Sequence, residues 1–146
     1  MIVVGVDGSG GAARALEFAA TEAELRRTQL RVVCAWRVPV PAYAGSMIAP
    51  AIQTEGFATA MRDAAESQVD DAVREHAGLD LELALREGSP TSVLLDEATR
   101  AELLVVGSRG RGGFAGLLLG SVSQQVAVHA ACPVVVVPAS AADRGG

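Results

Sequence analysis

The chain has 146 residues, a net charge of -5 and a mean hydropathy of +0.32. This length suits one domain, and 50% hydrophobic against 20% charged residues excludes a disordered chain. The acidic balance disfavours binding to nucleic acid or to an anionic membrane, and no apolar run is long enough to span a bilayer. Because the N-terminus opens into an apolar segment without a signal-peptide pattern, we expect a cytoplasmic protein.

Residues 2–6 and 30–36 are short, nearly continuous apolar runs, which are typical of strands buried on both faces of a sheet. Between them, a glycine-rich turn at residues 8–11 precedes a helical pattern that runs to about Arg27. One face of this helix carries apolar residues at i, i+3, i+4 and i+7, namely Leu16, Ala19, Ala20 and Ala23.

The segment from Arg37 to about Glu55 holds three prolines and no periodic pattern. We therefore predict a long loop, of a kind that is usually functional or mobile. A second helix is expected to run to about Ala77, with a face formed by Met61, Ala65, Val69, Ala72 and Val73. Leucines then alternate with mostly polar residues over 79–86, which predicts a strand with one solvated face near a sheet edge.

The third helix is expected to begin with Ser89 as N-cap and Pro90 as first residue, and to run to about Arg100. A buried strand at 103–106 leads into a glycine-rich stretch, 107–120. Ser121 and Gln124 have the spacing of a capping box, which predicts that Ser121 caps a fourth helix ending near Ala130. The last predicted strand covers 133–137, and a domain of residues 1–138 is followed by a flexible tail, 139–146.

This alternation of strands and helices predicts an α/β domain with a mostly parallel sheet, helices on both faces and right-handed crossovers. In doubly wound sheets of this kind, ligands bind beyond the carboxyl ends of the strands, where the strand order reverses. Those ends are Asp7, Ala35–Trp36 and Gly107, so we expect a ligand site there.

The most informative segment leaves a strand at Gly107 and enters the fourth helix after Gly120. Glycines allow the backbone to approach a ligand closely, and successive free amides form an anion-binding concavity. The start of the next helix adds a partial positive charge and unpaired amides, and Arg109 and Arg111 strengthen the local positive field. We therefore predict phosphate binding here, the alternative being a flexible connection closed by an ordinary helix cap.

The spacing G-x2-G-x9-G-S, at Gly107, Gly110, Gly120 and Ser121, resembles the ATP-binding pattern of the universal stress protein family. Residues 4–9, 88–90 and 132–135 resemble other segments of that family in the same order, so the likeness covers about residues 2–138. It implies a single three-layer domain of the adenine nucleotide alpha hydrolase-like type, with four helices and five strands in the order 3-2-1-4-5. It also implies an ATP-binding regulatory protein of the stress response with slow or no ATP hydrolysis.

The resemblance further implies roles for individual residues. Asp7 would lie against the nucleoside, and Ala35 or its neighbour would line the adenine pocket. Gly107 and Gly110 would follow the ribose and phosphates, and Gly120, Ser121 and the amide of Val122 would hold the phosphate tail. The predicted nucleotide-binding set is completed by Gly8, Ser9, Val106 and Arg109. A magnesium or manganese ion is expected with the nucleotide, held mainly by its phosphates.

Alternatives to this assignment stay open at the level of the sequence. Asp7 can serve only to shape an Asx turn, and residues 8–13 formally match the dinucleotide-binding pattern G-x-G-x-x-A. The chain can also be a nucleotide-independent dimeric interaction module or a true enzyme, such as a nucleotide hydrolase. We predict no catalytic residues, since His76 and His129 lack metal-ligand spacing and no paired carboxylates are evident.

The last strand and the two cysteines carry separate predictions. Residues 134–137 are apolar on both faces, and the strand order that the resemblance implies places them at a sheet edge. Because an open hydrophobic edge tends to pair with another strand, we predict a twofold homodimer through Cys132 to Ala139. Cys34 and Cys132 are expected to be reduced thiols with structural roles.

Overall fold

In the computed structural model, which describes residues 1–37, 51–111, 116 and 118–140, five strands alternate with four helices. The strands are β1 (Ile2–Val6), β2 (Leu30–Trp36), β3 (Leu81–Glu87), β4 (Leu103–Gly107) and β5 (Val134–Val137). The helices are α1 (Gly10–Arg26), α2 (Ala51–Glu75), α3 (Pro90–Ala98) and α4 (Ser121–His129). All neighbouring strands are parallel, in the order β3-β2-β1-β4-β5. The predicted α/β class and strand order are confirmed.

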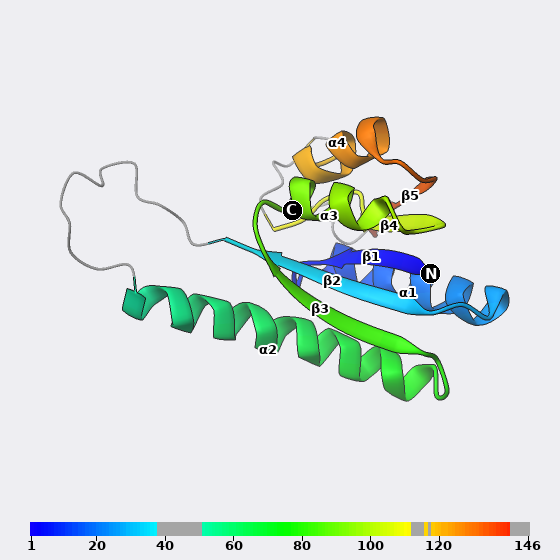
Figure 1. Ribbon diagram of the computed structural model, residues 1–146, viewed down its shortest axis with the longest axis horizontal. Coiled ribbons are helices and arrows are strands. Elements are labelled where there is room, and N and C mark those ends of the chain that lie inside the picture. The colour runs from blue at the N-terminus through cyan, green and yellow to red at the C-terminus, as the bar shows by residue number, and fades with distance from the viewer. Residues whose placement is uncertain (38–50, 112–115, 117, 141–146) are drawn as a thin grey trace.

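The sheet is the middle of three layers (Figure 1). Helices α1 and α2 lie on one face and enclose a core with Ile2, Val4, Leu30 and Val32. Helices α3 and α4 lie on the other face, over a second core that includes Val3 and Leu104. Alternate residues of β1 therefore enter opposite cores, which explains why its sequence is apolar without a break.

Helix α1 begins and packs as its sequence predicts. The predicted stripe Leu16, Ala19, Ala20 and Ala23 is buried, with at most 2% of any of the four exposed. The helix starts after Ser9, whose Oγ accepts a hydrogen bond from the Ala12 amide at 3.2 Å. Helix α3 starts in the same way: Ser89 accepts from the Ser92 amide at 3.2 Å, and Pro90 is the first helical residue.

Helix α2 differs from its prediction at its start and on its buried face. It begins at Ala51, so the predicted loop over 37–55 is wrong for its last residues, and residues 38–50 lie outside the described part of the chain. Val73 is 49% exposed, whereas Met61 and Ala72 are buried. At about 100° per residue, Val73 lies about 120° around the helix from Met61, and Ala72 only about 20°.

Strand β3 lies at a sheet edge, as predicted, but its polar face is less solvated than expected. Its leucines pack partly against the core under α2, while Ala84 on the opposite face is buried. Glu82 pairs with Arg31 at 2.6 Å, and Arg86 pairs with Glu97 of α3 at 2.9 Å. Ion pairs with β2 and α3 therefore replace part of the solvent contact.

No helix in the described part of the chain is long and apolar enough to cross a membrane. Most of the predicted tail, residues 141–146, lies outside the described residues. Its first residue, Ala139, is tied to the domain, because its amide donates to the Ser108 Oγ at 3.0 Å.

Candidate functional site

A cleft of about 620 Å³ opens at the carboxyl ends of β1, β2 and β4. The chain leaves β1 toward one face and β4 toward the other, so the cleft lies where the strand order reverses, as predicted. Ten of the eleven predicted site residues line it: Asp7, Ser9, Ala35, Val106, Gly107, Arg109, Gly110, Gly120, Ser121 and Val122. Gly8 is not among the lining residues and has a φ of +80°, which gives it a role in the turn.

Asp7 connects the turn after β1 to the loop after β4. Its Oδ1 accepts from the Ser9 amide at 3.0 Å, which forms the Asx turn that the sequence left as an alternative. Its Oδ2 accepts from the Arg111 amide at 3.0 Å, from a segment 104 residues later in the chain. The carboxylate therefore shapes its own turn and also fixes the glycine loop.

Two glycines of the loop are required by close contacts within the protein. A Cβ at Gly107 would lie 2.9 Å from the backbone of Gly11, because the end of β4 meets the first turn of α1. A Cβ at Gly110 would lie 2.6 Å from the Asp7 Oδ2. The fold alone therefore explains these two glycines.

Gly120 is different, because nothing inside the described protein requires a glycine there. Its φ of -75° suits any residue, and an added Cβ would make only ordinary contacts, at 3.5 Å and beyond. Gly120 is the N-cap of α4 and offers no side-chain cap. The predicted capping box is therefore wrong: Ser121 is the first helical residue, and its side chain cannot reach back as an N-cap does.

The start of α4 consequently presents donors to the cleft. The first amides of a helix have no partner within the helix, and those of Ser121, Val122 and Ser123 have no hydrogen-bond partner among the described residues. All three residues line the cleft. Helices α1 and α3 each use a serine cap instead. This end of α4 can therefore accept an anion.

Ser123 and Ser108, which the sequence analysis did not identify, hold the loop closed at its base. The Ser123 hydroxyl can donate to either of two carbonyl oxygens, that of Ser108 at 2.9 Å or that of Gly120 at 3.0 Å. The Gly120 amide donates to the same Ser108 carbonyl at 2.6 Å. Both serines are buried, so these bonds fix where α4 starts relative to β4.

The opposite wall of the cleft is largely apolar, and only its strand end, Ala35–Trp36, was predicted from the sequence. Strand β2 contributes Val33 and Trp36, and α2 contributes Phe57 and Met61. The sequence gives no local signal for the α2 residues, because only the crossover from β2 brings that helix over the strand ends. An apolar wall facing a set of amide donors suits a ligand with a flat apolar part and an anionic part.

A magnesium or manganese ion would need oxygen ligands. Among the described lining residues, Asp7 offers the one carboxylate, and each of its oxygens already accepts an amide hydrogen bond. The donor set therefore fits an ion that phosphates hold, and does not form a protein cage for one.

The thiol beside the cleft is not an activated nucleophile. Burial raises the pKa of Cys34, and the negative charge of Asp7 raises it further. The Cys34 thiol therefore stays protonated at neutral pH. Both Cys34 and Cys132 are free thiols, as predicted.

The geometry at the start of α1 disfavours the dinucleotide alternative. The pyrophosphate in that motif binds amides at the first turn of the helix, but Ser9 caps the Ala12 amide here. A Cβ at Gly11 would lie 2.8 Å from the Arg109 carbonyl, so the loop after β4 covers this turn. The serine cap and the loop after β4 therefore occupy part of the first turn of α1, whereas the start of α4 carries no side-chain cap.

Comparison with known proteins agrees with this geometry. The model of the universal stress protein family matches residues 1–138. The chain belongs to the universal stress protein family. A universal stress protein of Thermus aquaticus is 35% identical over 93% of this chain and 96% of its own. One of Mycobacterium tuberculosis is 35% identical over 93% of this chain but 46% of its own, so this universal stress protein spans about half the length of several relatives that it matches.

Solved structures show the same fold. A universal stress protein in complex with cAMP superimposes with a TM-score of 0.66 and 30% identity, over 95% of this chain and 97% of that one. A universal stress protein of Archaeoglobus fulgidus in complex with dAMP gives a TM-score of 0.60 and 26% identity, over 92% of this chain and 94% of that one. Two structural relatives thus bind adenine nucleotides.

Proposed function

We propose that this universal stress protein is a regulatory ATP-binding protein that holds the nucleotide in the cleft at the ends of β1 and β4. The adenine would lie against the apolar wall that includes Ala35, and the phosphates would bind the amides of Ser121 and Val122. Magnesium or manganese would be bound through the phosphates. The cAMP and dAMP complexes of relatives support an adenine nucleotide as ligand.

One observation carries this proposal: the helix start at Gly120 is open. Its amides face the cleft without a capping side chain, and neither φ nor packing requires a glycine at this position. A phosphate would use both features, since it needs close approach to the backbone and several donors.

Hydrolysis is proposed to be slow or absent. A general base must lie free to accept a proton from water. Among the described lining residues the carboxylate of Asp7 is engaged by two amides, and no histidine lines the cleft. The bound nucleotide would therefore act as a signal rather than as a substrate.

A second proposal concerns the assembly. Strand β5 forms the edge of the sheet, and Val134, Val135 and Val136 are only partly buried. Pairing of two such edges would bury them in a twofold dimer. This edge also favours the alternative of a dimeric interaction module that works without nucleotide.

Small molecules that remain bound through purification separate these functions. We expect mass spectrometry of the denatured protein to show ATP, ADP or AMP, and calorimetry of the stripped protein to show tighter binding of MgATP than of adenosine. If the stripped protein binds no adenine nucleotide, the interaction module is the better account.

A further inference from the structure

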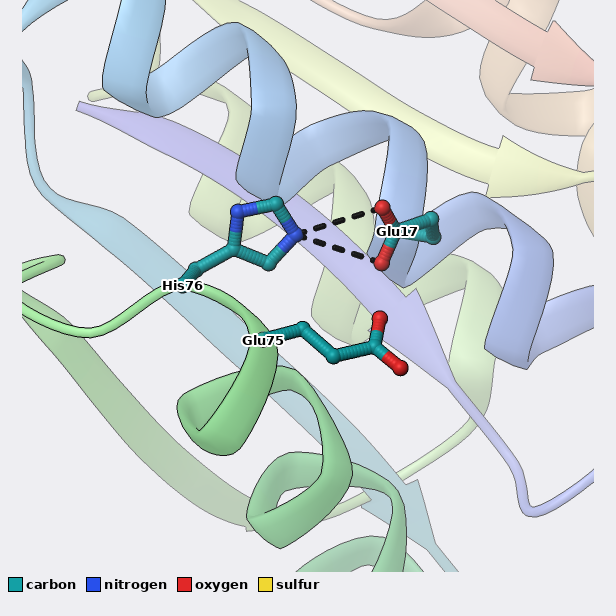
Figure 2. A group of neighbouring side chains, drawn as sticks. All are labelled: Glu17, Glu75 and His76. Atoms are coloured by element: carbon teal, nitrogen blue, oxygen red, sulfur yellow. Dashed lines mark hydrogen bonds and ion pairs between the residues drawn. The ribbon is translucent and has the colours of Figure 1, made fainter.

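A histidine and three glutamates meet at the far end of the domain from the cleft. His76 follows the last residue of α2, Glu75, and is only 9% exposed. Its Nε2 lies 3.2 Å from both carboxylate oxygens of Glu17 on α1, and its Nδ1 lies 3.0 Å from Glu24 Oε2, two turns later on α1. Glu75 completes the group. Figure 2 shows the imidazole and both carboxylates, Glu17 and Glu75, directed toward one another.

We propose that Glu17, Glu75 and His76 bind Zn²⁺, with Glu24 as the residue that orients the imidazole. Zinc binds histidine nitrogen and glutamate oxygen, and its sites with three protein ligands leave a fourth position open. Magnesium and calcium prefer oxygen ligands alone, so the imidazole selects against them.

The distances suit a small ion. The Glu17, Glu75 and His76 ligand atoms all lie within 4.8 Å of one another. Zinc bonds of about 2.0–2.2 Å in tetrahedral geometry separate two ligand atoms by about 3.3–3.5 Å. The His76–Glu17 separation of 3.2 Å is already close to this spacing, and the Glu75 side chain is exposed and therefore free to move toward it.

Glu24 provides the support that metal-bound histidines usually have. When Nδ1–H donates to Glu24, the lone pair is left on Nε2, which faces Glu17. Such a carboxylate–histidine contact fixes the ring and its tautomer in zinc sites. The hydrogen bond to Glu24 raises the pKa of His76, although burial opposes this, so protons compete with a metal for the ring.

The charges of the group point to a cation as well. Three carboxylates surround one imidazole, so two negative charges remain even when the ring is protonated. Among the described residues no arginine pairs with Glu17, Glu24 or Glu75, and Glu75 has no ion-pair partner. A divalent cation would relieve the repulsion between Glu17 and Glu75.

Glu75→Gln is the sharpest test, because this exposed side chain has no partner to lose and the variant should fold normally. The full chain would be stripped with EDTA, dialysed and titrated with ZnCl₂ by calorimetry and thermal melting. We expect one Zn²⁺ per chain and a melting point raised by roughly 5–10 °C at about 100-fold excess over the dissociation constant. Glu75→Gln should weaken Zn²⁺ binding at least about tenfold.

Two matched controls locate the ion. Glu66→Gln makes the same charge change elsewhere on the exposed face of α2, and His129→Gln removes the exposed histidine at the end of α4; both should bind Zn²⁺ as the parent does. The proposal is overturned if the parent binds no Zn²⁺, if Glu75→Gln binds it equally well, as binding through a thiol would give, or if Mg²⁺ raises the melting point equally.

Discussion

The Asp7 carboxylate accepts the amide of Arg111 at 3.0 Å, and this bond fixes the glycine loop after β4 to the turn after β1. The second oxygen of Asp7 accepts the Ser9 amide. One side chain thus positions the turn after β1 and the loop after β4 relative to each other before any ligand arrives. Preorganisation of this kind lowers the entropic cost of ordering the site when a ligand binds.

Asp7→Asn should loosen this connection. Asparagine keeps one carbonyl oxygen, but its NH₂ group cannot accept from the second amide. We expect a loss of about 1–2 kcal/mol in unfolding free energy, together with weaker nucleotide binding. Hydrogen exchange should be faster at the Arg111 amide, and an unchanged exchange rate there would contradict the role given to Asp7.

Gly120→Val should reduce ATP affinity at least about tenfold, or about 1.4 kcal/mol, with the fold intact. The branched side chain would stand over the first amides of α4, yet a Cβ at this position meets no atom of the described protein closer than 3.5 Å. Calorimetry gives the affinity, and thermal melting checks the fold. Full ATP binding by a folded variant would remove the site assignment.

Gly107→Ala should behave in the opposite way and destabilise the fold. Its Cβ would lie 2.9 Å from the Gly11 backbone, which cannot move aside as a flexible side chain can. We expect the free energy of unfolding, measured in urea, to fall by about 1–3 kcal/mol. Gly120→Ala is the matched control and should lose less, at most about 1 kcal/mol, because alanine is only a poorer N-cap than glycine and meets no close contact; equal losses in the two variants would show that Gly120 is structural.

Glu97→Ala should destabilise the protein without affecting the cleft. Glu97 is 6% exposed, and its carboxylate binds Arg31 at 2.8 Å and Arg86 at 2.9 Å. In the variant, Arg31 still pairs with Glu82 and Arg86 still pairs with Asp96. We therefore expect the unfolding free energy to fall by about 1–3 kcal/mol, less than if a buried charge were left without a partner. Glu102→Ala, which breaks an exposed pair with the N-terminus, should cost less than about 1 kcal/mol.

Val135→Lys should dissociate the proposed homodimer. The change places a charge on β5, at the edge where two chains would pair. Sedimentation should show a lower mass than for the parent, with thermal melting to confirm folding. Leu25→Lys on the exposed side of α1 is the control, and a sedimentation profile unaltered by Val135→Lys would count against this interface.

The sheet could be predicted because each of its strands carries a local signal. The apolar run at Ile2–Val6 predicts a buried strand within five residues. The serine before α3 predicts the start of that helix in the same local way. The apolar wall could not be predicted, because Phe57 and Met61 reach the cleft only through the crossover after β2. The capping box failed for a related reason: Gly120 takes the extended N-cap conformation, and the Ser123 hydroxyl bonds back to the Gly120 carbonyl, so the helix starts one residue earlier than the motif implies.

The backbone amides at the start of α4 are the proposed phosphate site, and NMR of a ¹⁵N-labelled sample observes them one by one. On titration with MgATP, the amide resonances of Ser121, Val122 and Ser123 should shift until saturation, whereas adenosine should leave them in place. If these resonances do not move at saturating MgATP, or move equally with adenosine, the phosphates are not held there.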